Sequence, residues 1–254
     1  MKKLVVLAAI VVMTVVDAMA QYGIKFGELE VDATNASDIF GDGKVSYDPA
    51  LNVLMLHEGF EYHLSKNFVT INTGCDFGIR LVGDAEIVAS VDCSDNLYIE
   101  ATGSHTLKIT SNISGSALKC PNLTVGNGVT LELLSRNSQA DMYALDCGDL
   151  LTVSGGNLKA EVTTANMAVA TQCMTLEGCW MQKPRGGFVG SIAGGICYGD
   201  GIPAKVVNIT VTGFSVGENQ GDGFSQGVLK LVENGKVVII KEGKRFNLKG
   251  QRIQ

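Results

Sequence analysis

Residues 117–120 read Ala117-Leu118-Lys119-Cys120, and residues 144–147 repeat this phrase as Ala144-Leu145-Asp146-Cys147. Looser copies of the phrase end at Cys93 and at Cys173. The four cysteines therefore follow one another at intervals of 27, 27 and 26 residues. A near-constant interval of this size indicates an internal structural repeat.

Each copy continues with apolar residues that alternate with other residues, and a period of two places every second side chain on one face of a strand. One repeat cannot bury its apolar face alone, whereas stacked repeats bury a continuous core. We therefore predict an all-β protein in which residues 61–213 form a right-handed parallel β-solenoid. An antiparallel sandwich with coincidental spacing is the alternative. The alternating pairs are Leu97 and Ile99, Leu123 and Val125, Leu151 and Val153, and Met174 and Leu176.

In this solenoid the four cysteines are expected to stack on adjacent coils, with Leu97, Leu123 and Leu151 beside them. Stacked residues lie about 4.8 Å apart, which is farther than the ~3.8 Å between the Cβ atoms of a disulfide. We therefore expect buried thiols, with disulfides as the alternative in an oxidising compartment. The cysteines and histidines do not have the spacing of a metal site.

Carboxylates flank two of the stacked cysteines at equivalent positions. The repeat predicts an outward ladder of alternating charge, formed by Asp92, Lys119, Asp146 and Gln172, with Asn122 between Asp95 and Asp149 in a second column. Catalysis would require two or three acids that converge, so no catalytic residue is expected. The candidate ligand-binding residues are Asp92, Asp95, Asp146 and Asp149, together with the aromatic residues Tyr98 and Tyr143.

Two lysines, Lys2 and Lys3, follow the first methionine, and the stretch from Leu4 to Val16 contains no charge. The small residues Ala18 and Ala20 come after it. A basic start, a short apolar run and a small-x-small site are typical of a secretory signal. We expect residues 1–20 to be cleaved. The apolar run is too short to span a membrane, which needs about 20 residues, and we predict no transmembrane segment after cleavage.

Net charge is distributed unevenly. From Lys230 onward the chain contains seven basic and two acidic residues, so this tail carries a net charge of +5. Residues 21–229 carry a net charge of −12. An acidic body argues against nucleic acid as a partner, because nucleic-acid binding needs a basic surface. A basic tail on an acidic body fits docking or sorting better than catalysis.

Turn-forming residues divide the rest of the chain. Residues 21–60 are expected to form an N-terminal β segment with hairpins, and residues 214–227 a glycine-rich linker. Residues 228–254 are expected to form a small C-terminal β-meander, because Asn234-Gly235 is a strong hairpin signal. Whether this tail sorts the protein or caps the solenoid stays open.

Two phrases resemble those of secreted bacterial β-helix proteins of the carbohydrate-binding-domain type. These are residues 41–50, Gly-Asp-Gly-Lys-Val-Ser-Tyr-Asp-Pro-Ala, and residues 151–156, Leu-Thr-Val-Ser-Gly-Gly. The C-terminal stretch 234–253 is similar to the sorting tails of the type IX secretion route. The resemblance implies a β-helix that binds carbohydrate, and it does not specify the ligand.

These observations together favour a secreted or outer-surface protein that is not an enzyme and that binds carbohydrate or a cell-surface component. A β-helix polysaccharide lyase or glycoside hydrolase is one alternative, and a purely structural or adhesion protein is another. No cofactor is expected. Calcium is the exception to be tested, and Asp38, Asp42 and Asp48 are its candidate ligands. Their spacing does not match the calcium-binding loop of an EF-hand, and ordinary turns explain their positions better.

Overall fold

The computed structural model describes residues 21–112, 115–137, 142–164 and 167–211, and the short strands of the tail. Side chains of residues 64–67 and of the tail strands are not part of this description. The predicted signal at 1–20 and the predicted linker at 214–227 lie outside the described residues.

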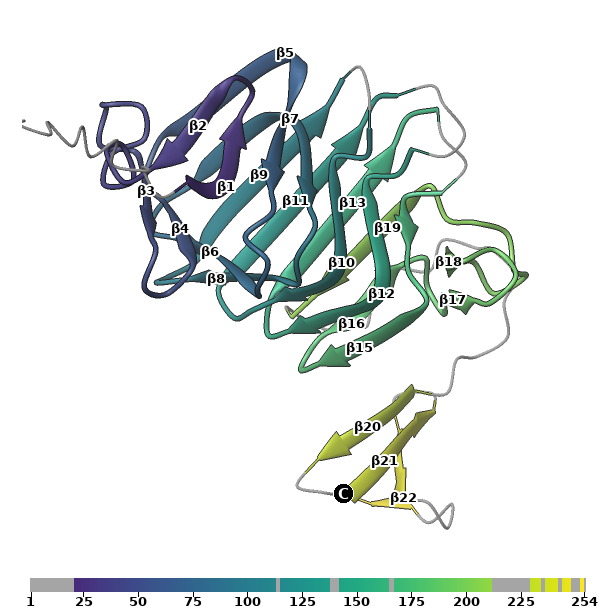
Figure 1. Ribbon diagram of the computed structural model, residues 1–254. Coiled ribbons are helices and arrows are strands. Elements are labelled where there is room, and N and C mark those ends of the chain that lie inside the picture. The colour runs from purple at the N-terminus through teal and green to yellow at the C-terminus, as the bar shows by residue number, and fades with distance from the viewer. Residues whose placement is uncertain are drawn as a thin grey trace, which may run out of the picture.

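The body is a parallel β-solenoid of about five turns, as predicted, and the sandwich alternative is wrong. Figure 1 shows the coils stacked side by side, with strands that recur at the same place in each coil. The described residues contain no helix, and therefore none that could cross a membrane.

Three parallel sheets form the faces of the solenoid. Each later strand lies beside the strand one coil earlier, so residues about one repeat apart become neighbours. The first face consists of β4 (Val53–Leu56), β6 (Phe77–Leu81), β8 (Leu97–Ala101), the second halves of β10 (Leu118–Val125) and β12 (Leu145–Ser154), and β15 (Cys173–Glu177).

The other two faces share long strands that bend at a corner. The second face consists of the first halves of β5 (Phe60–Ile71) and β7 (Ala85–Cys93), then β9 (His105–Ser111), β11 (Val129–Ser135) and β13 (Asn157–Val162). The third face consists of the second halves of β5 and β7, the first halves of β10 and β12, and β14 (Val169–Ala170).

Antiparallel strands cover both ends of the solenoid, which reduces the open sheet edge that parallel coils leave behind. Parallel pairing begins at β4, ahead of the expected boundary at residue 61. At the N-terminal end β1 (Gln21–Phe26) pairs with β2 (Leu29–Asp32) and β5, and β3 (Val45–Asp48) pairs with β4. At the other end β19 (Val206–Thr210) pairs with β13 and β16 (Trp180–Lys183), and β18 (Gly195–Cys197) pairs with β14 and β17 (Phe188–Gly190).

The core consists of ladders of identical or similar apolar side chains. Leu97, Leu123 and Leu151 pair in register on successive coils and are fully buried, as predicted. Burial of one such leucine side chain contributes about 1.5–3 kcal/mol. The register of the solenoid is therefore strongly specified, because a shift by one residue would turn every leucine outward.

The cysteine ladder extends over three coils and not four. Cys120 lies directly opposite Cys147, and Cys93 occupies the rung before them. The prediction for Cys173 is wrong, because this residue pairs with Leu150 and is exposed. Asp146 pairs with Ala170, which places Thr171 on the rung after Cys147.

The tail forms an antiparallel four-stranded sheet, which confirms the predicted meander. Its strands are β20 (Leu229–Glu233), β21 (Lys236–Lys241), β22 (Lys244–Asn247) and β23 (Arg252–Ile253).

Candidate functional site

One outward column on the first face carries the only predicted aromatic candidate that is strongly exposed among the described residues. Strand alternation points the column to solvent, because the residues on either side of it are buried in the core. Register places its members on successive coils, and they are Gly78, Tyr98, Thr124, Thr152 and Thr175. We call this column the Tyr98 ladder.

Tyr98 is 45% exposed and its hydroxyl donates to the Asp76 carboxylate at 3.5 Å. Gly78 occupies the preceding rung, so no side chain of that rung lies beside the tyrosine. Thr124 follows on the next rung with a hydroxyl group. The ring and a hydroxyl thus lie together on the same face of the sheet.

A chain of side-chain hydrogen bonds runs along the corner next to the Tyr98 ladder. Asn122 donates to Asn96 at 2.7 Å, and Asn96 donates to Asp76 at 2.8 Å. The side chain of Asn122 in turn accepts the backbone N–H of Leu150 at 3.0 Å. These bonds hold Asp76 beside Tyr98 and leave its other carboxylate oxygen facing the tyrosine hydroxyl.

An ion pair adjoins the other side of Tyr98 on the same face. Arg80 Nη2 lies 2.6 Å from Glu100 Oε1, and Arg80 Nε donates to the same oxygen. Both charges are therefore matched locally. The Tyr98 ladder itself contains no charged side chain.

Asp92 and Asp146 lie on the third face, away from Tyr98. Asp92 and Asp146 both pair with Lys119, so the predicted alternation of charge is present. Burial raises the pKa of the Asp146 carboxyl, and Lys119 opposes this effect. The prediction that Gln172 is the fourth member of this charge ladder is wrong, because Ala170 pairs with Asp146 at that position.

Asp95 and Asp149 occupy equivalent positions, because each lies two residues after a stacked cysteine and two residues before a stacked leucine. The prediction for Asn122 is wrong, because Asn122 pairs with Leu150 and does not lie between the two carboxylates. The hydrogen-bond partners of the two carboxylates differ. Asp95 Oδ2 accepts the backbone N–H groups of Thr73 at 2.6 Å and Gly74 at 3.2 Å, so it stabilises a turn of the preceding coil. Asp149 lies in a bulge, where the register between β10 and β12 shifts. Its exposed carboxylate accepts a hydrogen bond from Gln172 at 3.2 Å.

Tyr143 lies at a third place, just before β12. It is half-buried, and its backbone N–H donates to Ser116 Oγ at 3.0 Å. The structure therefore does not bring the six candidate residues together into one site. Of the two aromatic candidates, Tyr98 alone is strongly exposed, and it lies in register with the hydroxyl groups of the threonines.

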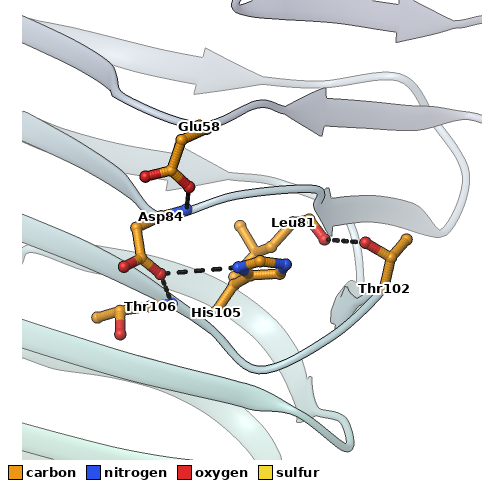
Figure 2. A network of polar contacts seen from close by, with 6 residues as sticks. All are labelled: Glu58, Leu81, Asp84, Thr102, His105 and Thr106. Atoms are coloured by element: carbon orange, nitrogen blue, oxygen red, sulfur yellow. Dashed lines mark hydrogen bonds and ion pairs between the residues drawn. The ribbon is translucent and has the colours of Figure 1, made fainter.

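A groove of about 350 Å³ at the corner between the first and second faces escaped the sequence analysis. Figure 2 shows how its carboxylates bind backbone N–H groups of neighbouring coils: Glu58 accepts from Asp84 at 3.0 Å, and Asp84 accepts from Thr106 at 2.7 Å. His105 Nδ1 lies 3.8 Å from Asp84, and Lys108 pairs with Glu86 at 2.7 Å. These charges are largely occupied in holding the coils together.

The candidate calcium ligands are engaged in turns of their own segment. Asp38 accepts the N–H groups of Asp42 and Gly43, and Asp48 accepts that of Ala50 at 2.9 Å. Across the described part of the chain, no group of three or more His, Cys, Asp or Glu residues is arranged to hold a metal ion.

Comparison with known proteins adds no relative: no family model, no curated protein and no solved structure matches the chain.

Proposed function

We propose that the chain is a non-catalytic β-solenoid that binds carbohydrate on the Tyr98 ladder. The single observation that carries this proposal is the exposed Tyr98 ring, which lies in register with a column of threonines. The apolar faces of sugar rings stack on aromatic side chains, which combine an apolar ring with a polar tip.

The polar neighbours of Tyr98 suit sugar hydroxyls. A carboxylate accepts hydrogen bonds, and amides and hydroxyls both donate and accept them. Asp76, Asn96 and Thr124 supply these three kinds of group around the ring. Further threonines follow at intervals of about 4.8 Å along the solenoid, so several hydroxyls lie in line.

A polysaccharide lyase or hydrolase is the less favoured function. On the third face Asp92 and Asp146 lie about 9.6 Å apart, two strand spacings, with Lys119 between them. The lysine offsets part of their charge.

For location we propose secretion or attachment to the outer cell surface. The support is the signal-like pattern of residues 1–20, and the similarity of stretch 234–253 to sorting tails agrees with it.

The test is a glycan array with the chain from Gln21 onward, with and without calcium. The Tyr98→Ala variant should lose binding, because the stacking platform is gone. Tyr198→Ala is the matched control, because Tyr198 is equally exposed at 43% but lies near the other end of the solenoid. Equal binding by wild type and Tyr98→Ala would remove the ladder from the proposal, and release of reducing sugar from any polysaccharide would favour the enzyme.

A further inference from the structure

The last coil carries a short excursion that leaves the solenoid after β16 and returns at β19. Its two strands, β17 and β18, form a hairpin that Figure 1 shows beside β19 at the C-terminal end of the body. Ala170 pairs with Gly195, and Ala204 N–H donates to the Ile196 carbonyl at 2.9 Å. The excursion is therefore fixed to the core and does not hang freely.

The excursion is apolar on its outside as well as on its inside. Ile196 and Cys197 are fully buried and attach it to the body. Of the ten large apolar side chains that are exposed in the described residues, four lie here. They are Phe188 (43% exposed), Ile192 (103%), Tyr198 (43%) and Ile202 (58%).

These side chains gather at two turns. Ile192 lies at the tip of the turn that Gly194 N–H closes on the Gly190 carbonyl, and Tyr198 N–H closes the second turn on the Ile202 carbonyl. Strands of three residues separate the turns, a length of about 10 Å. The two turns therefore lie close together on the exposed side of the body.

Charge distinguishes the excursion from the rest of the body. Residues 183–205 contain Lys183, Arg185 and Lys205 against Asp200, a net charge of +2, whereas residues 21–229 as a whole carry −12. The most apolar exposed segment is thus also a local basic region on an acidic body. This combination complements a surface that is apolar inside and negatively charged outside.

The size of the excursion argues against a protein partner. A stable protein interface buries about 800 Å² on each side with complementary shape, and two small turns do not offer such a face. A bilayer interface accepts single apolar side chains without shape complementarity, and aromatic residues favour the headgroup level. Basic residues add attraction to anionic lipid.

We propose that the β17–β18 excursion docks the protein on an anionic phospholipid surface, with Ile192 and Ile202 inserted and Phe188 and Tyr198 at the headgroup level. The protein then lies on the membrane and does not span it. This proposal does not depend on the Tyr98 ladder.

The test is co-sedimentation of the chain from Gln21 onward with vesicles of phosphatidylcholine and phosphatidylglycerol, beside vesicles of phosphatidylcholine alone. The wild type should bind the anionic vesicles more strongly, and salt should weaken this preference. Ile192→Ser and Ile202→Ser should each lower the partition coefficient about tenfold, since each removes one inserted side chain. Leu51→Ser is the matched control, because Leu51 is 60% exposed at the opposite end of the molecule, and it should bind like the wild type.

Circular dichroism verifies that each variant is folded, which full exposure of Ile192 leads us to expect. The basic tail can hold some protein on anionic vesicles by charge alone, and high salt weakens that contribution. The decisive comparison is therefore the vesicle binding of Ile192→Ser and of the wild type at high salt. Equal binding by Ile192→Ser and wild type overturns the proposal, and so does an equal loss in Leu51→Ser. Self-association that Ile192→Ser abolishes, without vesicle binding, would identify a second copy as the occupant and overturn it as well.

Discussion

Cys120 and Cys147 lie directly opposite each other on the adjacent parallel strands β10 and β12, and both side chains are buried in the core. The hydrogen bond between the two thiols and the burial of Cys120 raise the pKa of the Cys120 thiol. A protonated thiol in this place is an apolar filler of the coil and a poor nucleophile. The same hydrogen bond lowers the pKa of the Cys147 thiol, so the low reactivity expected of Cys120 rests on its raised pKa and that expected of Cys147 rests on its burial in the core.

Thiol reactivity should follow burial. In the native protein a thiol reagent should modify Cys75 and Cys173 rapidly, because both are exposed. The four buried thiols should react only in guanidinium, and they are Cys93, Cys120, Cys147 and Cys197. Mass spectrometry of labelled peptides, without reductant, measures both sets. If fewer than two further thiols become reactive on denaturation, disulfides have formed and the prediction of buried thiols is wrong.

Stability should fall at alkaline pH because of buried acids that keep their protons. Burial raises the pKa of Cys93 from 9.0 to about 12 and that of Tyr62 from 10.0 to about 12. As the pH rises, the unfolded chain releases these protons at a lower pH than the folded protein does. The contribution of the protonated groups to the free energy of unfolding is therefore complete below pH 9 and is lost as the pH rises towards 12. For Cys93 the slope is at most about 1.4 kcal/mol per pH unit.

Denaturant unfolding between pH 8 and about pH 11, above the ordinary pKa of a thiol, measures this loss. Cys93→Ala should flatten the pH dependence although it lowers the stability at neutral pH. Cys173→Ala should retain the wild-type slope, because Cys173 is exposed. Parallel slopes for wild type and Cys93→Ala would remove this thiol from the explanation.

Lys119 should matter more than other exposed lysines, because it lies between Asp92 and Asp146 on the third face. Lys119→Met would leave two carboxylates facing each other across one rung. We expect a loss of about 0.5–1 kcal/mol at pH 7, limited by solvent screening of the exposed lysine. The loss should shrink as the pH falls, because burial raises the pKa of the Asp146 carboxyl and protonation then removes its negative charge.

The matched control for this lysine is Lys159→Met on the second face. Lys159 pairs in register with Glu132 on one side and with the neutral Asn208 on the other, so its removal leaves only one adjacent acid. Urea unfolding at neutral and at acidic pH compares the two variants. An equal loss in both, independent of pH, would mean that the lysine stem and not its charge stabilises the ladder.

The sequence allowed the repeat to be predicted because leucine and cysteine recur at the same rung, but the last coil misled the register. Thr171 occupies the position of the stacked cysteines in that coil, and its side chain is buried. Its hydroxyl group is satisfied there, because it donates to the carbonyls of Cys173 at 2.8 Å and Asp149 at 3.3 Å. A polar residue that satisfies its hydroxyl locally can replace a thiol in the core. Cys173, two residues later, matched the interval by coincidence.

The corner groove could not be predicted from local phrases. Glu58 and Asp84 meet because they occupy turns of consecutive coils, and those turns have the same length but different sequences. The prediction for Asn122 failed for a related reason, since β10 has one residue fewer than β12 between the stacked cysteine and the stacked leucine, and this shift pairs Asn122 with Leu150. Strand registers repeat in the sequence, whereas turn registers depend on the folded coil.

The threonines of the Tyr98 ladder provide the sharpest separation between binding and folding. Thr152→Val keeps the shape of the side chain and removes only its hydroxyl, and valine suits a strand at least as well. We therefore expect an unchanged melting temperature and a loss of glycan affinity of about tenfold, which corresponds to one hydrogen bond of about 1.4 kcal/mol. Isothermal titration with the best ligand from the array measures the affinity. Thr70→Val makes the same change on the third face, where Thr70 pairs with Asp92, and it should bind as the wild type does. If both variants bind alike while Tyr98→Ala does not bind, the tyrosine acts alone and the threonine column takes no part in recognition.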